Sequence, residues 1–182
     1  MISRAPILPT LLLALLTCST VNAQRDHLTP QEVDLVKEAQ ILDKRIEVFI
    51  KAADRRVMVL NGTQSANAKQ LKKDSELWGE LPSGSHADLL ADIAGILDEA
   101  ITNIDDVSAR DERNPLIPKA LRRLAEAVNN IMTQVAPYRD QAKSDGEVAS
   151  LESLNEEAQQ ILEAVKKLPP PSETETKAKK KN

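Results

Sequence analysis

The stretch LTPQEVDLVKEAQILDKRIEVFIKAADRRVMVL, residues 28–60, carries the clearest helical pattern in the chain. Its start has the residues of a capping box: Thr29 and Glu32 can each accept a hydrogen bond from the other's backbone amide. Pro30 fits the first helical position, where its missing N–H leaves no hydrogen bond unmade. These residues therefore begin a helix, and none of them is left over to act as a ligand.

Apolar residues recur along this stretch at steps of three and four, which is the spacing of one face of a helix. That face consists of Val36, Ala39, Leu42, Ile46, Phe49, Ala53, Val57 and Leu60. The pair Asn61-Gly62 follows and is typical of a left-handed helix end. The pattern predicts one continuous helix over residues 30–60.

The same rhythm returns three times and predicts further helices over about 86–109, 115–136 and 145–167. Two of them have capping residues, Ser85 with Asp88 and Ser144 with Glu147, and Pro137 should kink or end the third predicted helix. The chain is 41% hydrophobic but only 2% aromatic, which favours helices packed through aliphatic side chains. Four amphipathic helices with short links bury their apolar faces around one shared axis. We therefore predict an all-α protein, an antiparallel four-helix bundle over residues 24–168.

The link between the first two predicted helices should carry a short extra helix at about 68–80. The helix over 30–60 has a second set of apolar residues off its main face, which are Leu35, Ile41, Val48 and Val59. Either the link folds over this set, with Trp78 as the largest apolar side chain available, or another protein covers it. We favour the first alternative. The four residues and Trp78 are the candidate interaction surface.

Both ends of the chain have the composition of segments outside the bundle. Residues 1–23 predict an export signal, with an apolar run and the small-residue exit VNA at 21–23. The alternative is a lipoprotein anchored through Cys18, although Thr17 is unusual before such a cysteine. Residues 169–182 predict a disordered tail. Its lysines, Lys177, Lys179, Lys180 and Lys181, would give weak contact with an anionic surface. We expect a periplasmic or secreted protein.

Composition excludes several classes of function. The net charge of −4 is a poor match for nucleic acid, whose phosphates require a basic face. The only aromatic residues, Phe49, Trp78 and Tyr138, are too few to form a stacking platform for bases. Removal of the signal also removes Cys18, the only cysteine, and with it disulfides, zinc–thiolate sites and thiol catalysis. The sequence contains no GxSxG, HExxH or phosphate-binding glycine loop, so we predict no enzyme and no catalytic residue.

Ligand-binding residues are equally sparse. His27 and His86 stand at or just before helix starts, where we interpret them as solvent-exposed end residues. A bundle-borne haem or metal is the alternative, for which His27 with Met58 would be the pair to look for, although no spacing requires it. We predict no cofactor and no metal. The basic clusters at 54–56, 69–73 and 121–124 we interpret mostly as exposed faces.

The pieces LTPQEV, DKRIEVFIKA and DRR within residues 28–60 resemble the opening of exported bacterial proteins that carry no assigned function. The resemblance implies export and brings no catalytic or binding residues with it. The sequence thus predicts a non-enzymatic protein that acts through protein contacts, as an adaptor, scaffold or accessory subunit. A carrier of haem, metal or an apolar molecule and a membrane-surface protein are the alternatives.

Overall fold

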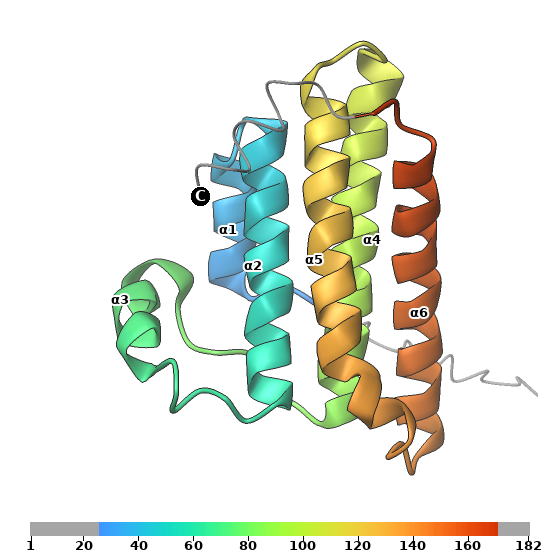
Figure 1. The fold of residues 1–182 in the computed structure, drawn as a ribbon. Helices are drawn as coiled ribbons and strands as arrows, with labels where there is room; N and C mark the ends of the chain where they lie inside the picture. Colours follow the sequence, from blue (N-terminus) through green and yellow to red (C-terminus); the bar gives the residue numbers. More distant parts are fainter. Residues whose placement is uncertain (1–25, 171–182) are drawn as a thin grey trace, which may run out of the picture.

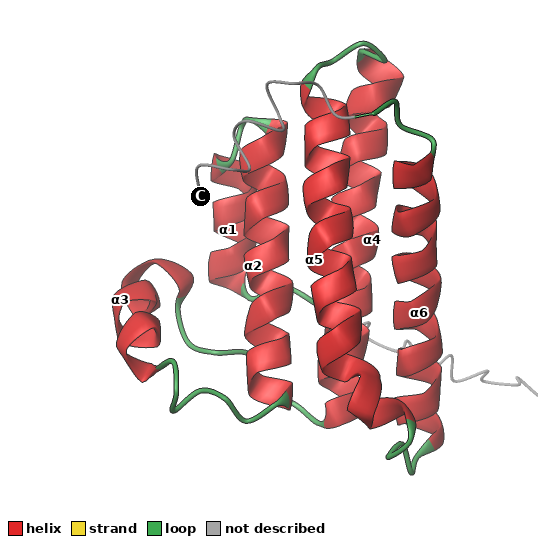
Figure 2. Cartoon of the chain, in the orientation of Figure 1, coloured by secondary structure: helices red, strands yellow, loops and turns green. Residues whose placement is uncertain are grey.

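The structure, a computed structural model, describes residues 26–170, which form six α-helices and no β-strand (Figure 2). The prediction of an all-α fold is confirmed for this part of the chain. The predicted export signal with Cys18 lies outside the described residues, as does the tail from residue 171 onward. The helices are α1 Pro30–Glu38, α2 Leu42–Leu60, α3 Ala68–Trp78, α4 His86–Arg110, α5 Leu116–Arg139 and α6 Asp145–Lys166.

The four long helices α2, α4, α5 and α6 pack together as a helical bundle (Figure 1). Isoleucines from each of them, Ile46, Ile93, Ile131 and Ile161, are fully buried in its core. Burial of one such side chain contributes about 1.5–3 kcal/mol. Because the core is almost entirely aliphatic, the packing of one helix against another depends on the shape and spacing of apolar side chains and on few polar contacts.

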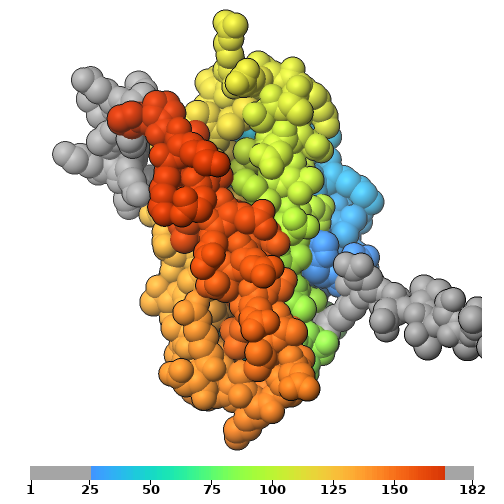
Figure 3. Space-filling view, turned by 90° about the vertical axis from the view of Figure 1, so that its right-hand side faces the viewer, coloured from blue at the N-terminus to red at the C-terminus, as the bar shows by residue number. Residues whose placement is uncertain are grey.

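Consecutive bundle helices run in alternating directions, but their neighbours in space are not all antiparallel (Figure 1). The most extensive packing joins α4 to α6, which run the same way, and α2 and α5 form a second such pair. α4 and α5 are joined by a short link and pack less closely. Figure 3 shows α6 lying across the face made by α4 and α5. The expected antiparallel arrangement therefore describes α2 with α4 and α5 with α6, and not the two pairs that run in parallel.

The prediction of one helix over residues 30–60 is wrong. The chain leaves the helix after Glu38, turns through residues 39–41 and starts α2 at Leu42, so that α1 folds back beside α2 (Figure 1). No glycine or proline stands at the turn. The break is therefore imposed by the contacts that α1 makes after it has folded back.

Local signals placed the other helix starts well. Capping boxes are present at Thr29 with Glu32, Ser85 with Asp88 and Ser144 with Glu147. The helix predicted from about residue 115 starts at Leu116, whose amide donates to the side chain of Asn114 at 3.0 Å. It continues through Pro137 to Arg139. None of the described helices is long and apolar enough to cross a membrane.

Candidate functional site

A group of charged side chains is buried where α1, α2 and α4 meet. It comprises Glu32 of α1, Arg55 and Arg56 of α2 and Asp92 of α4, and we call it the charge cluster. Glu32 is 0% exposed, Arg55 3% and Arg56 1%. Two acids and two bases balance, which is the condition under which ionised side chains tolerate burial.

Glu32 is the centre of the charge cluster and serves two purposes with its two oxygens. Its Oε2 accepts from the Thr29 amide at 2.9 Å, which completes the capping box of α1. Its Oε1 accepts from Arg55 Nε at 3.2 Å and from Arg56 Nη1 at 2.7 Å. The residue that starts α1 therefore also fixes α1 against α2.

Arg55 connects α2 to the link that follows α3. Its Nη2 donates to the backbone carbonyls of Trp78 at 3.1 Å, Gly79 at 3.3 Å and Glu80 at 2.6 Å. Burial lowers the pKa of the Arg55 guanidinium, and the neighbouring Glu32 carboxylate acts in the opposite direction. The guanidinium donates to three carbonyl oxygens, one at the end of α3 and two in the link that follows, so it holds irregular backbone in position.

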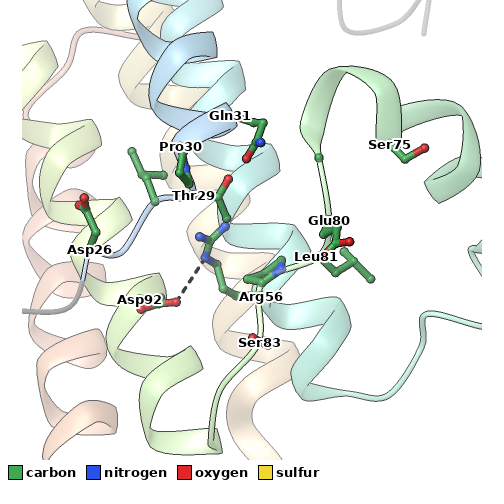
Figure 4. A pocket seen from close by; sticks show the side chains of 13 residues that line it. Asp26, Thr29, Pro30, Gln31, Arg56, Ser75, Glu80, Leu81, Ser83 and Asp92 are labelled. Atoms are coloured by element: carbon green, nitrogen blue, oxygen red, sulfur yellow. Dashed lines mark ion pairs between the residues drawn. The ribbon is translucent and has the colours of Figure 1, made fainter.

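Arg56 ties the N-terminal segment to the bundle. Its Nη2 donates to the His27 carbonyl at 2.7 Å and its Nη1 also donates to the Ala52 carbonyl at 2.9 Å. Its Nε lies 3.7 Å from Asp92 Oδ2, and the two side chains form an ion pair (Figure 4). Among the described residues, this Nε has no hydrogen-bond acceptor. The guanidinium thus joins three segments of the chain.

The His27 side chain lies on α4 at a glycine. A Cβ at Gly95 would stand 3.0 Å from the imidazole ring, so only glycine lets the segment approach this closely. The His27 Nε2 is 2.8 Å from Glu99 Oε2. The prediction that His27 is simply a solvent-exposed end residue is therefore wrong, because the ring is part-buried and paired.

An open cleft of about 650 Å³ lies beside the charge cluster, between the start of α1 and the link after α3 (Figure 4). Arg56 and Asp92 line it, together with the exposed acids Asp26 and Glu80 and the amide of Gln31. Because Arg56 is already matched by Glu32 and Asp92, the exposed acids decide the charge of the opening. Such a cleft suits a polar or cationic group better than an anion.

The candidate interaction residues are not brought together as one surface. Leu35, Val48 and Val59 are partly buried against the core, whereas Ile41, in the turn between α1 and α2, is 56% exposed. Trp78 is only 6% exposed and packs on α2. Lys51 Nζ lies 4.7 Å from the centre of its ring and Arg55 Cζ 5.6 Å, two cation–π contacts. The segment between α2 and α4 therefore covers α2 at Trp78.

Sequence reasoning missed the charge cluster. The interpretation of DRR at 54–56 as an exposed basic face is wrong for both arginines, which are buried. A signal was present, since Arg55 and Arg56 stand seven residues after Val48 and Phe49 and so share their helix faces. An arginine in register with apolar residues indicates a buried cation, and a buried cation requires an acid partner.

His86 and the tail lysines are the remaining predicted residues. His86 contacts Tyr138 edge-on with ring centres 5.3 Å apart, beside a smaller hollow of about 310 Å³ where α4 begins and α5 ends. Within residues 26–170 no group of three histidine, cysteine, aspartate or glutamate side chains is placed to hold a metal ion. Lys177 and Lys179 to Lys181 lie outside the described residues.

Searches of this chain against protein-family models, curated proteins and solved structures find no match.

Proposed function

We propose that this chain is a non-enzymatic, exported helical-bundle protein that acts through protein–protein contacts, as an adaptor, scaffold or accessory subunit. The observation that supports this proposal is the placement of α3. Figure 1 shows α3 standing away from the bundle, beside the short α1, while side chains of its inner side reach α2. It offers a whole helix face to a partner.

The two sides of α3 differ in kind. The inner side carries Trp78 on α2 and Asp74, which pairs with Lys51 at 2.7 Å. The outer side carries Leu77, which is 59% exposed, and the exposed lysines Lys69, Lys72 and Lys73. A helix of 11 residues is marginally stable in water without packing. A partner that covers the outer side would add the packing that the bundle does not supply.

The chemistry of the outer side indicates the chemistry of the partner. Three lysines within five residues, on a chain with net charge −4, form a local basic patch on an acidic protein. Leu77 lies at the edge of this patch and is the large apolar side chain of α3 that is most exposed. We infer a partner protein with an acidic surface beside an apolar hollow, because opposite charge directs the encounter and burial of Leu77 holds the complex.

The test is crosslinking in the native envelope with a variant that reverses the patch, Lys69→Glu with Lys72→Glu and Lys73→Glu. We expect the partner captured by the unchanged chain to be lost, and a Leu77→Ser variant to reduce capture with less effect of salt. The matched control reverses three exposed lysines elsewhere, Lys143→Glu with Lys166→Glu and Lys167→Glu. Equal capture by the patch variant and the control would refute α3 as the contact surface.

The cleft favours one second candidate, a carrier of a small ligand. Its volume of about 650 Å³ is within the range of small-molecule sites, and polar side chains converge on it. The test is native mass spectrometry, with an absorbance spectrum, of protein purified from its own host. A retained small molecule that is lost in an Asp26→Asn, Glu80→Gln double variant would favour the carrier over the adaptor.

A further inference from the structure

The turn between α1 and α2 contains no helix-breaking residue. Ala39, Gln40 and Ile41 include no glycine or proline, and the apolar spacing runs through them without interruption. Alanine and glutamine favour helix, and isoleucine is close to neutral. As a local sequence, residues 30–60 prefer one helix, and the hairpin exists only because α1 gains contacts by folding back.

Those contacts lie far from the turn itself. Glu32 receives Arg55 and Arg56 from α2, and the His27 carbonyl receives Arg56. At the turn, Arg45 Nε donates to the Ala39 carbonyl at 3.0 Å. The docking site for residues 26–38 is therefore made by α2, α4 and the link after α3, and any copy of residues 26–38 that reaches this site can fill it.

We propose that two copies of this chain exchange residues 26–38, with α1 and α2 joined as one straight helix in each copy. Each exchanged segment makes the same contacts with its partner that it makes within one chain. The gain is helical structure at residues 39–41 in both chains, because the turn between α1 and α2 is removed from each. This is a domain-swapped dimer, in which a hinge that prefers to be straight drives the association.

Exposure of Ile41 fits this proposal. It is 56% exposed at the turn, and within residues 26–170 only Leu77 has a higher value among the large apolar residues. In a straight helix, residues 41 and 48 share a face, because seven residues are close to two turns. Straightening thus moves Ile41 from an isolated exposed position into line with the partly buried Val48. The proposal does not use the outer side of α3, since the docking site for residues 26–38 is made by α2, α4 and the link after α3.

The exchange is tested with an engineered thiol pair. A Cβ at Gly95 would lie 3.2 Å from the Cβ of His27, slightly below the usual disulfide spacing of about 3.5–4.5 Å. The full chain carries Cys18→Ser, so that His27→Cys and Gly95→Cys hold the only thiols. A disulfide closes within one chain in the monomer and between two chains in the exchanged dimer. Denaturing electrophoresis without reductant separates the two products.

Hinge variants identify the cause of any dimer. Ile41→Pro breaks a continuous helix, whereas the present turn needs only a shift of φ from −93° toward about −65° at residue 41, which is extended and precedes the first helical position. It should lower the dimerisation constant by about a hundredfold for each hinge, because a proline inside a helix costs roughly 3 kcal/mol. Gln40→Gly should lower it by a few-fold per hinge. Ile41→Ala keeps the helix possible and is the matched control.

We expect a covalent dimer whose share rises with protein concentration during refolding, persists in Ile41→Ala and falls in the order Gln40→Gly, Ile41→Pro. Chromatography of the chain without engineered thiols should show the same order. Disulfides confined to single chains at all concentrations would overturn the proposal. Equal dimer in Ile41→Pro and Ile41→Ala would also overturn it. Gln40→Gly preserves the test if Ile41→Pro does not fold.

Discussion

The bundle and the flank of this protein are held by different forces. The bundle of α2, α4, α5 and α6 is joined by aliphatic side chains that repeat along every helix. The flank, by which we mean α1, α3 and the link 79–85, is joined to it by the charge cluster, by Trp78 and by a few apolar side chains of α1 that pack against the core. In the bundle many similar contacts each contribute a small part of the stability, whereas in the flank a few specific contacts contribute most of it.

Because of this difference, the two kinds of contact fix the positions of helices with different precision. Aliphatic packing is tolerant of neighbours, so bundle helices need only the right face and length. A buried carboxylate accepts few arrangements, because each of its oxygens requires donors at the right distance. The charge cluster therefore determines where the flank lies, while the bundle supplies most of the free energy of folding.

Loss of Glu32 should have the largest effect of any single change in the flank. In Glu32→Ala, Arg55 loses the acid that it pairs with in a buried site, and Arg56 keeps only its 3.7 Å ion pair with Asp92. We expect unfolding free energy to fall by about 3–5 kcal/mol, measured by urea denaturation followed by circular dichroism. Glu38→Ala, at the exposed end of α1, is the control and should change it by less than about 0.5 kcal/mol. Similar losses for the two variants would show that the cluster does not hold the flank.

A core truncation gives the matching measurement for the bundle. Leu124 of α5 is fully buried, and Leu124→Ala should lower unfolding free energy by about 2–5 kcal/mol through lost burial and a cavity. The exposed Leu77→Ala should cost far less. Because many similar contacts hold the bundle together, we expect α1 to keep its position in the Leu124 variant. Hydrogen exchange at the α1 amides, compared with exchange at the bundle amides, should be unchanged. Selective loss of protection in α1 would contradict the division into two regions.

Trp78 provides a probe of the flank alone, since it is the only tryptophan. Its burial on α2 predicts blue-shifted emission in the monomer. In a urea titration we expect its red shift to begin before helix content falls, because the flank has fewer contacts to lose. Coincident fluorescence and circular dichroism transitions would show that flank and bundle unfold as one unit.

The smallest expected effect concerns acidity on the bundle surface. Burial raises the pKa of the Glu157 carboxyl above its usual 4.5, and the nearby acids Asp98 and Glu156 raise it further. The contribution of Glu157 to stability is therefore full below the usual pKa and is lost as pH rises through the folded-state pKa. Glu157→Gln should be more stable than the unchanged chain near neutral pH and equal to it in acid. Thermal unfolding at both pH values checks this, with the exposed Glu152→Gln as control. A pH-independent difference would refute the assignment.

Most of the bundle can be predicted from the sequence, because its helices are marked by local capping residues and by periodic apolar residues. Ser85, Ser144 and their acids mark two helix starts by hydrogen bonds within one turn. Apolar steps of three and four identify the inward faces before any partner is known. The candidate site was harder, since Arg55 and Arg56 are identified as buried only when their faces are aligned with Val48 and Phe49. For Glu32 the sequence pattern indicates only the capping role, and the pairing with the two arginines appears only in the tertiary structure.

The sequence by itself determined that this protein is helical, where most of its helices start and which faces are dry, because these properties depend on neighbours within a few residues. Tertiary structure alone decided that residues 30–60 bend at 39–41, that α4 lies parallel to α6, and that Glu32 meets two arginines. Those outcomes depend on the free energy of contacts between segments distant in sequence. No local preference of residues 39–41 encodes that energy.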